Sequence, residues 1–154
     1  MAHIVGEITI DAPVDEVSDM VADERNEPKY NPRIVRAEKV TQGPVGTGTW
    51  FVAEPKGTGS RGQMTLEVLE YERPRRLHNA VRSSYMRVDG TLTFDAVDGG
   101  TRLRWDWEMG LVGPMRVLSP VLAVIGPRWE RRNWIGLKEY MESGHRGAAG
   151  WSRF

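Results

Sequence analysis

Proton transfer is the chemistry that a few polar side chains of this sequence could support. Histidine is a common general base, which makes His78 a candidate, and the phenol of Tyr30 could donate a hydrogen bond to a ligand carbonyl. His78 and Asn79 are neighbours in a predicted strand, so only one of them can point inward. Leu77 and Val81 favour the register in which Asn79 points inward and His78 faces solvent. The opposite register would make His78 a general base, so Tyr30, His78 and Asn79 are the catalytic candidates.

The sequence contains no recognisable metal or nucleotide motif. Its three histidines, His3, His78 and His145, are far apart, and cysteine is absent, so the usual ligand spacings of metal sites are missing. The motif GxSxG and the P-loop are also absent, and the GxGxxG at residues 57–62 does not open a predicted helix. Residues 57–60 (GTGS) indicate a turn and not a phosphate loop, because no helix is predicted after them. We therefore expect no metal and no cofactor.

Length and charge narrow the class of protein. The 154 residues suit one domain, and Lys plus Arg balance Asp plus Glu at 21 each, which favours no nucleic-acid partner. The most apolar segment, residues 111–125, contains Arg116 and two prolines and is too short to insert into a membrane. The lack of cysteine and of a signal-peptide pattern fits a cytoplasmic protein. A monomer and a homodimer are both compatible with the sequence.

The C-terminal third must position any internal site. Residues 101–109 alternate between apolar and charged side chains, which predicts a strand with one buried face. Residues 114–141 follow as one long helix with an apolar stripe. The predicted stripe consists of Leu118, Leu122, Ile125, Trp129, Leu137 and Tyr140. A bulky strand face followed by a bulky helix face indicates a sheet packed on a helix.

The rest of the chain predicts an antiparallel meander. Residues 3–10 form a first strand, and residues 14–21 and 23–29 form two short helices. Turn signals separate about six strands within residues 34–109, and Asp98-Gly99-Gly100 is the best hairpin signal. The sequence thus predicts an α+β fold, with a curved sheet around the C-terminal helix within residues 1–143. Residues 144–154 are expected to form a flexible tail.

Five short motifs lie along nearly the whole chain. They are residues 8–17 (ITIDAPVDEV), 30–32 (YNP), 45–49 (VGTGT), 99–103 (GGTRL) and 137–142 (LKEYME). Their order and spacing resemble the START-like (SRPBCC) superfamily, in its polyketide cyclase/dehydrase and lipid-transport branch. The resemblance implies a helix-grip fold, in which seven antiparallel strands wrap a long C-terminal helix over a deep cavity. It also implies an apolar or aromatic ligand such as a lipid, polyketide, sterol or quinone.

Three prolines in the last helix, Pro114, Pro120 and Pro127, depart from the family pattern. Pro120 suits the first helical turn, whereas Pro127 should kink or break the helix. Two interpretations stay open. Residues 114–125 could form a separately oriented half that lines or covers the cavity mouth, or the segment could be an ordinary bent helix packed on the sheet.

The apolar residues of the predicted strands and helix are the candidates for contact with a ligand. Each could equally be core, and residues 49–52 leave open whether Trp50 or Phe51 faces inward. Asn133 is expected to be buried with a structural partner, and the arginines around Glu130 indicate a solvated helix face. The ligand-binding candidates are Tyr30, Trp50, Met64, Leu66, Val88, Gly90, Leu92, Trp105, Trp107, Met115, Leu118, Leu122, Ile125 and Trp129.

These features support three classes of function. The first is a binding protein that holds a small apolar molecule in an internal cavity. The second is a polyketide cyclase, aromatase or dehydratase that uses the same cavity, with Tyr30, His78 or Asn79 in proton transfer. The third is an interaction module that uses the charged outer face of the sheet.

Overall fold

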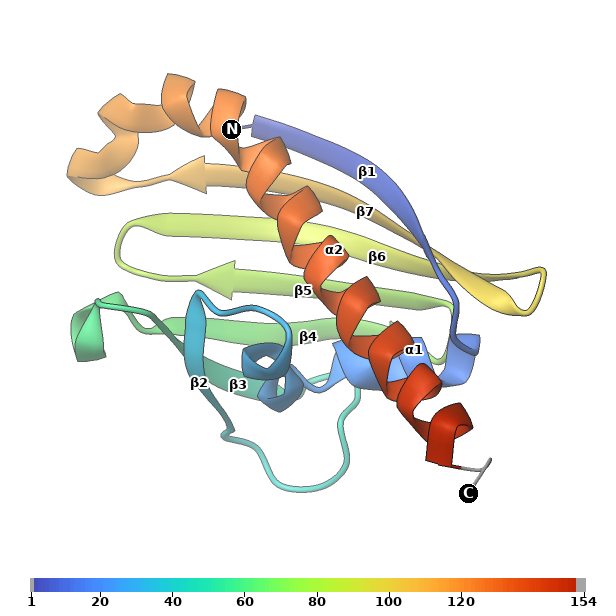
Figure 1. Ribbon diagram of the computed structural model, residues 1–154. Helices are drawn as coiled ribbons and strands as arrows, with labels where there is room; N and C mark the ends of the chain where they lie inside the picture. The colour runs from blue at the N-terminus through green and yellow to red at the C-terminus, as the bar shows by residue number, and fades with distance from the viewer. Residues whose placement is uncertain (1, 152–154) are drawn as a thin grey trace.

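A seven-stranded antiparallel sheet forms the frame of the molecule (Figure 1). The computed structural model describes residues 2–151, with side chains to residue 144. The strand order is β1-β7-β6-β5-β4-β3-β2, so β1 pairs beside the last strand and every pairing is antiparallel. The strands are β1 (Ala2–Ile10), β2 (Ile34–Lys39), β3 (Trp50–Pro55), β4 (Met64–Glu72), β5 (Arg76–Arg82), β6 (Met86–Val97) and β7 (Gly100–Leu111). The predicted α+β helix-grip architecture is confirmed.

Strand β7 follows the alternation that its sequence predicts. Leu103, Trp105 and Trp107 are buried, whereas Arg104 and Asp106 are exposed on the other face. This period of two arises because successive side chains of a strand point to opposite faces of the sheet. One face of the sheet is therefore apolar and must be covered by other elements.

The β6–β7 hairpin closes at the predicted turn. Asp98 and Gly99 both have positive φ angles, of 38° and 82°. A two-residue turn of this kind matches the right-handed twist of the strands, and aspartate followed by glycine tolerates it well. The hairpin fixes the register of β6 against β7, which pairs Gly90 with Trp107.

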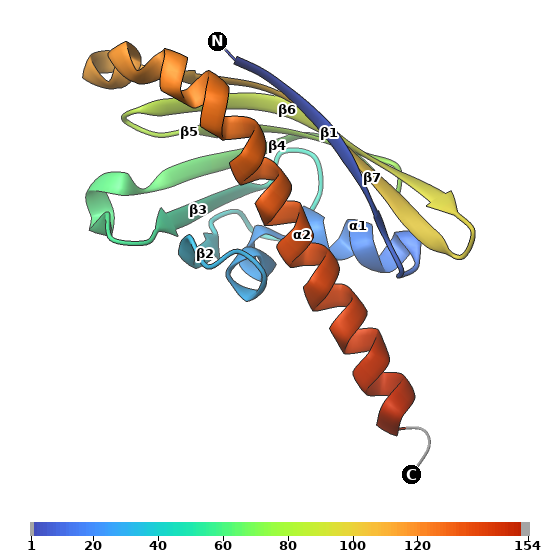
Figure 2. The ribbon, with the colours of Figure 1, turned by 45° about the horizontal axis from the view of Figure 1, so that its top comes forward.

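Helices cover the apolar face of the sheet. The long helix α2 (Ser119–Trp151) lies diagonally across it, while α1 (Val14–Ala22) and the 3-10 helix η1 (Glu24–Lys29) close one end (Figures 1 and 2). A second 3-10 helix, η2 (Gly59–Gly62), joins β3 to β4, and a third, η3 (Gly113–Leu118), leads into α2. None of the helices in the described part of the chain is long and apolar enough to cross a membrane.

The stripe predicted for α2 is only partly right. Leu122 and Leu137 are buried, but Trp129 and Tyr140 are 46% and 40% exposed. The face that meets the rest of the protein instead carries Leu122, Gly126, Glu130, Asn133, Trp134, Leu137 and Met141. Several of these residues are small or polar, so the bulky apolar residues of the sequence predict a stripe that lies about one position away from the observed face.

Two glycines on this face let α2 approach its neighbours closely. A Cβ atom at position 126 would lie 2.8 Å from the side chain of Ile4 on β1, and one at position 136 would lie 2.5 Å from the carbonyl oxygen of Tyr30. Both distances are shorter than a carbon contact allows. The close approach brings Tyr30 and α2 to the same end of the sheet.

The prolines act as turn and bend residues within a continuous helix. Pro120 lies in the first turn of α2, and Pro127 lies inside the helix, which continues without a break. The first turns bend relative to the remainder (Figures 1 and 2), as expected where proline removes a backbone donor. This arrangement fits the bent-helix interpretation. Helix α2 continues past the predicted domain boundary at residue 143 as far as Trp151. Within the expected tail, residues 144–154, the side chains from residue 145 onward lie outside the described part of the chain.

Candidate functional site

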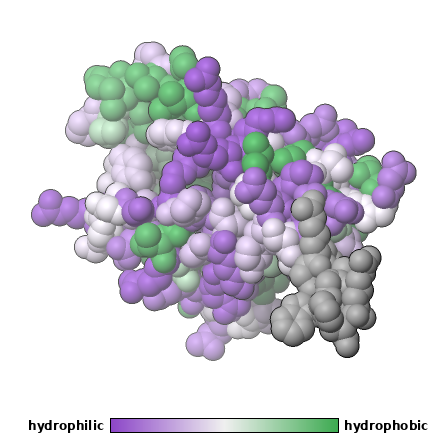
Figure 3. All heavy atoms as spheres, in the orientation of Figure 1, coloured by the Kyte–Doolittle hydropathy of each residue, from purple (hydrophilic) through white to green (hydrophobic). Residues whose placement is uncertain are grey.

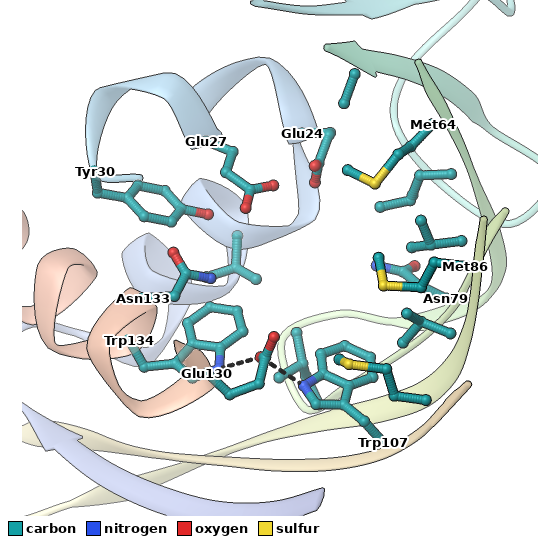
Figure 4. A pocket seen from close by; sticks show the side chains of 17 residues that line it. Glu24, Glu27, Tyr30, Met64, Asn79, Met86, Trp107, Glu130, Asn133 and Trp134 are labelled. Atoms are coloured by element: carbon teal, nitrogen blue, oxygen red, sulfur yellow. Dashed lines mark hydrogen bonds between the residues drawn. The ribbon is translucent and has the colours of Figure 1, made fainter. Parts of the chain in front are cut away.

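A cavity of about 150 Å³ lies between the sheet, η1 and α2 (Figure 4). Its apolar wall is built mainly by side chains of β3 to β7. The apolar lining residues are Val21, Ala53, Met64, Leu66, Val81, Met86, Val88, Leu92, Trp107, Met109 and Trp134. The polar lining residues are Glu24, Glu27, Tyr30, Asn79, Glu130 and Asn133.

The sheet wall agrees with the sequence-based prediction. Met64, Leu66, Val88, Leu92 and Trp107 line the cavity, because each occupies an inward position of its strand. Their contact with a ligand remains a prediction. Methionine is well suited to such a wall, since its flexible side chain adapts to irregular shapes.

The register of β5 places Asn79 inside and His78 outside. Asn79 is 7% exposed and lines the cavity, and its amide oxygen has no hydrogen-bond partner among the described residues. The Nε2 atom of His78 lies 2.9 Å from the Oδ1 atom of Asp89, on the opposite face of the sheet. The prediction that His78 could act as a general base in the cavity is therefore wrong.

The predictions that Trp50 on β3 and Gly90 on β6 line the cavity are also wrong. Trp50 is 37% exposed, because Phe51 is the inward residue of β3. Gly90 is buried, but a Cβ atom there would overlap the ring of Trp107. Gly90 therefore makes room for an indole and leaves no space for a ligand atom.

Trp105 belongs to the packed core and not to the cavity wall. Its ring stacks on that of Trp134, with centroids 6.0 Å apart. It is 3% exposed, and its indole nitrogen finds no partner within the described part of the chain. Gly6 on β1 provides the space beside it, since a Cβ atom there would overlap the Trp105 ring.

The predicted contacts from η3 and from the first part of α2 are also wrong. Met115, Leu118, Ile125 and Trp129 do not line the cavity. Apolar side chains instead gather on the surface over η3 and the first turns of α2 (Figure 3), where Met115 and Leu118 are 40% and 42% exposed. Leu122 is buried, but it lines a separate groove against the end of β7.

Trp129 instead packs on a neighbouring arginine outside the cavity. The guanidinium carbon of Arg33 lies 5.3 Å from the centroid of the Trp129 ring, and Arg33 also donates a hydrogen bond of 3.1 Å to the Trp129 carbonyl oxygen. Trp129 points outward because the inward face of α2 runs through Gly126, Glu130 and Trp134 instead.

Helix η1 brings two carboxyl groups and a phenol to one side of the cavity. Glu24, Glu27 and Tyr30 are spaced by three residues, and a 3-10 helix has three residues per turn, so their side chains lie on one face. Asp23 caps this helix by accepting a hydrogen bond of 3.1 Å from the backbone N–H of Arg25. Tyr30 was a predicted site residue, whereas Glu24 and Glu27 were not.

The environment of η1 favours the uncharged forms of its buried groups. Burial, and secondly the neighbouring Glu27 carboxylate, raise the pKa of Glu24 well above its usual value of 4.5. Burial also raises the pKa of Tyr30, with smaller effects from Glu27 and Glu24. The Glu27 carboxylate accepts a hydrogen bond of 2.8 Å from the side-chain amide of Asn31. The surroundings of Glu24 therefore favour its protonated form over the ionised one.

Glu130 supplies a third carboxyl group from α2. Its Oε2 atom accepts hydrogen bonds from the indole nitrogens of Trp107, at 2.9 Å, and Trp134, at 3.2 Å (Figure 4). Burial raises its pKa to about 7; the Glu27 charge also raises it, and the indole bonds and Arg33 lower it. The prediction that Glu130 lies on a solvated helix face is wrong.

The cavity thus combines apolar walls with acidic and amide groups, and none of its described lining residues is basic. The amide oxygen of Asn133 on α2 also lacks a partner among the described residues, in contrast to the structural link predicted for it. In the described part of the chain, no three His, Asp or Glu side chains are placed to hold a metal ion. Chemically, the site can hold an apolar molecule, accept hydrogen bonds from it and exchange protons near neutral pH.

Comparisons with known proteins agree with this architecture. The family model described as polyketide cyclase/dehydrase and lipid transport matches residues 1–142. A search of curated proteins found no significant match.

Solved structures share the fold at low sequence identity. A START superfamily protein from Mycobacterium smegmatis is 12% identical, with a TM-score of 0.77 over 93% of this chain and 99% of that chain. TTHA0849 from Thermus thermophilus is 18% identical, with a TM-score of 0.75 over 92% of this chain and 98% of that chain. The di-domain ARO/CYC protein BexL from the BE-7585A biosynthetic pathway is 21% identical, with a TM-score of 0.70 over 92% of this chain and 47% of BexL.

Proposed function

The chain belongs to the polyketide cyclase/dehydrase and lipid transport family, and we propose that it binds one small apolar or aromatic molecule in the cavity between the sheet and α2. The observation that carries the proposal is the cavity itself, an apolar space in which the Asn79 amide oxygen has no partner among the described residues. Buried polar atoms normally have a partner. A bound ligand would provide that partner and fill the space.

The size of the cavity limits the ligand. An apolar cavity of about 150 Å³ holds a molecule the size of benzene, whereas drug-sized ligands occupy pockets of about 300–1,000 Å³. The cavity here has a volume of about 150 Å³. We therefore propose that one ring, or an apolar group of that size, occupies it. A sterol or a large polyketide would need side chains such as Met64 and Met86 to move aside.

The expected affinity of a one-ring probe sets the conditions of the test. Burial of roughly 150 Å² of apolar surface at about 25 cal/mol per Å² is worth about 4 kcal/mol. This value corresponds to a dissociation constant of about 1 mM before binding costs and polar contacts are counted. Probes should therefore be added at millimolar concentration.

Methionine methyl groups provide a site-resolved assay. Met64, Met86 and Met109 line the cavity, whereas Met20 and Met115 do not. In NMR spectra of protein labelled at the methionine methyl groups, toluene and benzyl alcohol should shift the three cavity signals and leave those of Met20 and Met115 unchanged. A lack of shifts with every one-ring probe would refute the proposal.

A cavity-filling variant supplies an independent check. Ala53 is 2% exposed and lines the cavity, so Ala53→Leu should occupy part of it and abolish the probe-induced shifts. Ala96 lies exposed on β6 and gives the control Ala96→Leu, which should bind like the unchanged protein. Binding that survives Ala53→Leu would mean that the probes occupy another site.

A polyketide cyclase or dehydratase is the second candidate function, and Glu130 favours it. A carboxyl group with a pKa of about 7 can both donate and accept a proton near neutrality. Tyr30 and Asn79 are the predicted catalytic candidates that remain inside the cavity. In this case Glu130→Gln should keep substrate binding and abolish turnover, whereas in a carrier no turnover exists to be lost.

A further inference from the structure

We infer that the natural ligand carries a protonated amine on its small apolar or aromatic body, and that the ammonium group lies among the carboxyl groups of Glu24, Glu27 and Glu130. This inference rests on the proposed function and deepens it by naming the polar group of the ligand. Three observations support it, namely the charge of the lining, the unsatisfied amide oxygens and the aromatic side chains beside them.

The first observation is the one-sided charge of the cavity. Three glutamates line it, while no lysine, arginine or histidine of the described residues does so (Figure 4). The basic group that acts on Glu130 is Arg33, whose guanidinium lies outside against Trp129. Buried carboxylates without a cation are costly. An ammonium group would supply the positive charge that the lining itself does not provide.

The second observation is a shortage of hydrogen-bond donors. Within the described part of the chain, the amide oxygens of Asn79 and Asn133 have no partner, and Asn79 is more than nine-tenths buried at the cavity wall. An ammonium group has three donors and no acceptor, so it can donate to both unpartnered amide oxygens and to a glutamate oxygen. A ligand carboxylate, as in a fatty acid, would instead meet the Glu27 carboxylate and be repelled.

The third observation is the position of aromatic rings beside the carboxyl groups. Tyr30, Trp107 and Trp134 all line the same cavity, and both indoles hold the Glu130 carboxyl group. Aromatic faces attract cations, and more strongly where water is excluded. Carboxylates and aromatic rings together therefore recognise an ammonium group better than either does alone.

Binding of a cation should release protons from the site. Glu24 and Glu130 have raised pKa values, and the groups that act on them are Asp23, Glu27, the two indoles and Arg33. An ammonium group favours the ionised carboxylates and so lowers both pKa values. The affinity for an amine should therefore increase as pH rises from 6 to 8, whereas that for a neutral probe should change little.

Four one-ring probes of similar size test the inference, namely benzylamine, benzyl alcohol, toluene and benzoate. We expect benzylamine at pH 8 to bind at least about tenfold more tightly than benzyl alcohol, as is reasonable for a charge-assisted contact, and benzoate to bind most weakly. The methionine methyl shifts give the affinities. Neutral probes that bind as well as benzylamine would overturn the inference and leave the proposed function standing, whereas failure of all four probes would overturn both.

A matched pair of variants assigns the effect to the carboxyl groups. Glu27→Gln keeps an oxygen for the Asn31 amide but removes the charge, so benzylamine should lose about tenfold in affinity and benzyl alcohol should lose little. Glu139 is exposed on α2, and Glu139→Gln is the control that should change neither value. An equal loss for both probes in Glu27→Gln would indicate a change of cavity shape and would refute the charge contact.

Discussion

Ionisation of Glu130 should destabilise the folded protein as pH rises. Burial raises its pKa from 4.5 to about 7 in the folded state, while the unfolded chain exposes the carboxyl group to water and restores the ordinary value. The folded state therefore binds more protons than the unfolded state between these two pKa values. Below pH 4.5 the ionisation of Glu130 does not lower the free energy of unfolding. The free energy of unfolding falls as pH rises from 4.5 to 7, and the full loss is present above pH 7.

The size of the effect follows from the two pKa values. Each pKa unit corresponds to about 1.36 kcal/mol, so the whole shift from 4.5 to about 7 is worth about 3.4 kcal/mol. Part of this loss falls below pH 5, and about 2.5 kcal/mol of it falls between pH 5 and pH 8. Glu130→Gln cannot ionise, and its amide oxygen can still accept the indole hydrogen bonds of Trp107 and Trp134. The variant should gain about this amount of stability relative to the unchanged protein over the same pH range.

Urea unfolding followed by circular dichroism at pH 5, 6, 7 and 8 measures this difference. Glu139→Gln, at an exposed position of the same helix, is the control for a general change in charge and should give a nearly constant difference. A constant difference for Glu130→Gln would show that its carboxyl group titrates at an ordinary pH. The reasoning that places an uncompensated acid in the cavity would then be refuted.

Two further predictions concern the sheet. Gly90→Ala should lower the free energy of unfolding by about 1–3 kcal/mol, because its methyl group would overlap the ring of Trp107. Urea unfolding measures this loss, with Gly46→Ala as the control, because no described atom lies within 4 Å of a Cβ atom at that position. Equal stabilities of the two variants would contradict the prediction. His78→Ala should leave probe binding unchanged in the methionine methyl assay, since His78 pairs with Asp89 outside the cavity. A loss of binding in that variant would mean that the register of β5 is wrong.

The fold could be predicted from the sequence because its signals are local. The alternation of β7 depends only on neighbouring side chains, and the β6–β7 turn depends on Asp98 and Gly99. The inward position of Asn79 also followed from local signals, since Leu77 and Val81 share its face. Such patterns reflect the period of two, which follows from the local geometry of a strand.

The acidic half of the site could not be predicted in the same way. The spacing of Glu24, Glu27 and Tyr30 aligns the three side chains in one row only in a 3-10 helix, because every third residue of an α-helix drifts around the axis. Glu130 sits among arginines in the sequence, and its partner Trp107 is 23 residues away. A charged residue in a helical sequence ordinarily indicates a face exposed to solvent. Glu130 is an exception, because α2 packs closely on the sheet and Glu130 lies on the side that faces it.

The size and the charge of the cavity have a common structural origin. Gly90 seats Trp107 against the sheet, and Trp105 stacks on Trp134, so these contacts fix two indoles whose nitrogens hold Glu130. The same two rings occupy volume that a larger ligand would need. A substitution that truncates either indole should therefore enlarge the cavity and also remove a hydrogen bond from the Glu130 carboxyl group. Selection for a small ligand and selection for a ligand that donates hydrogen bonds would then act on the same few residues.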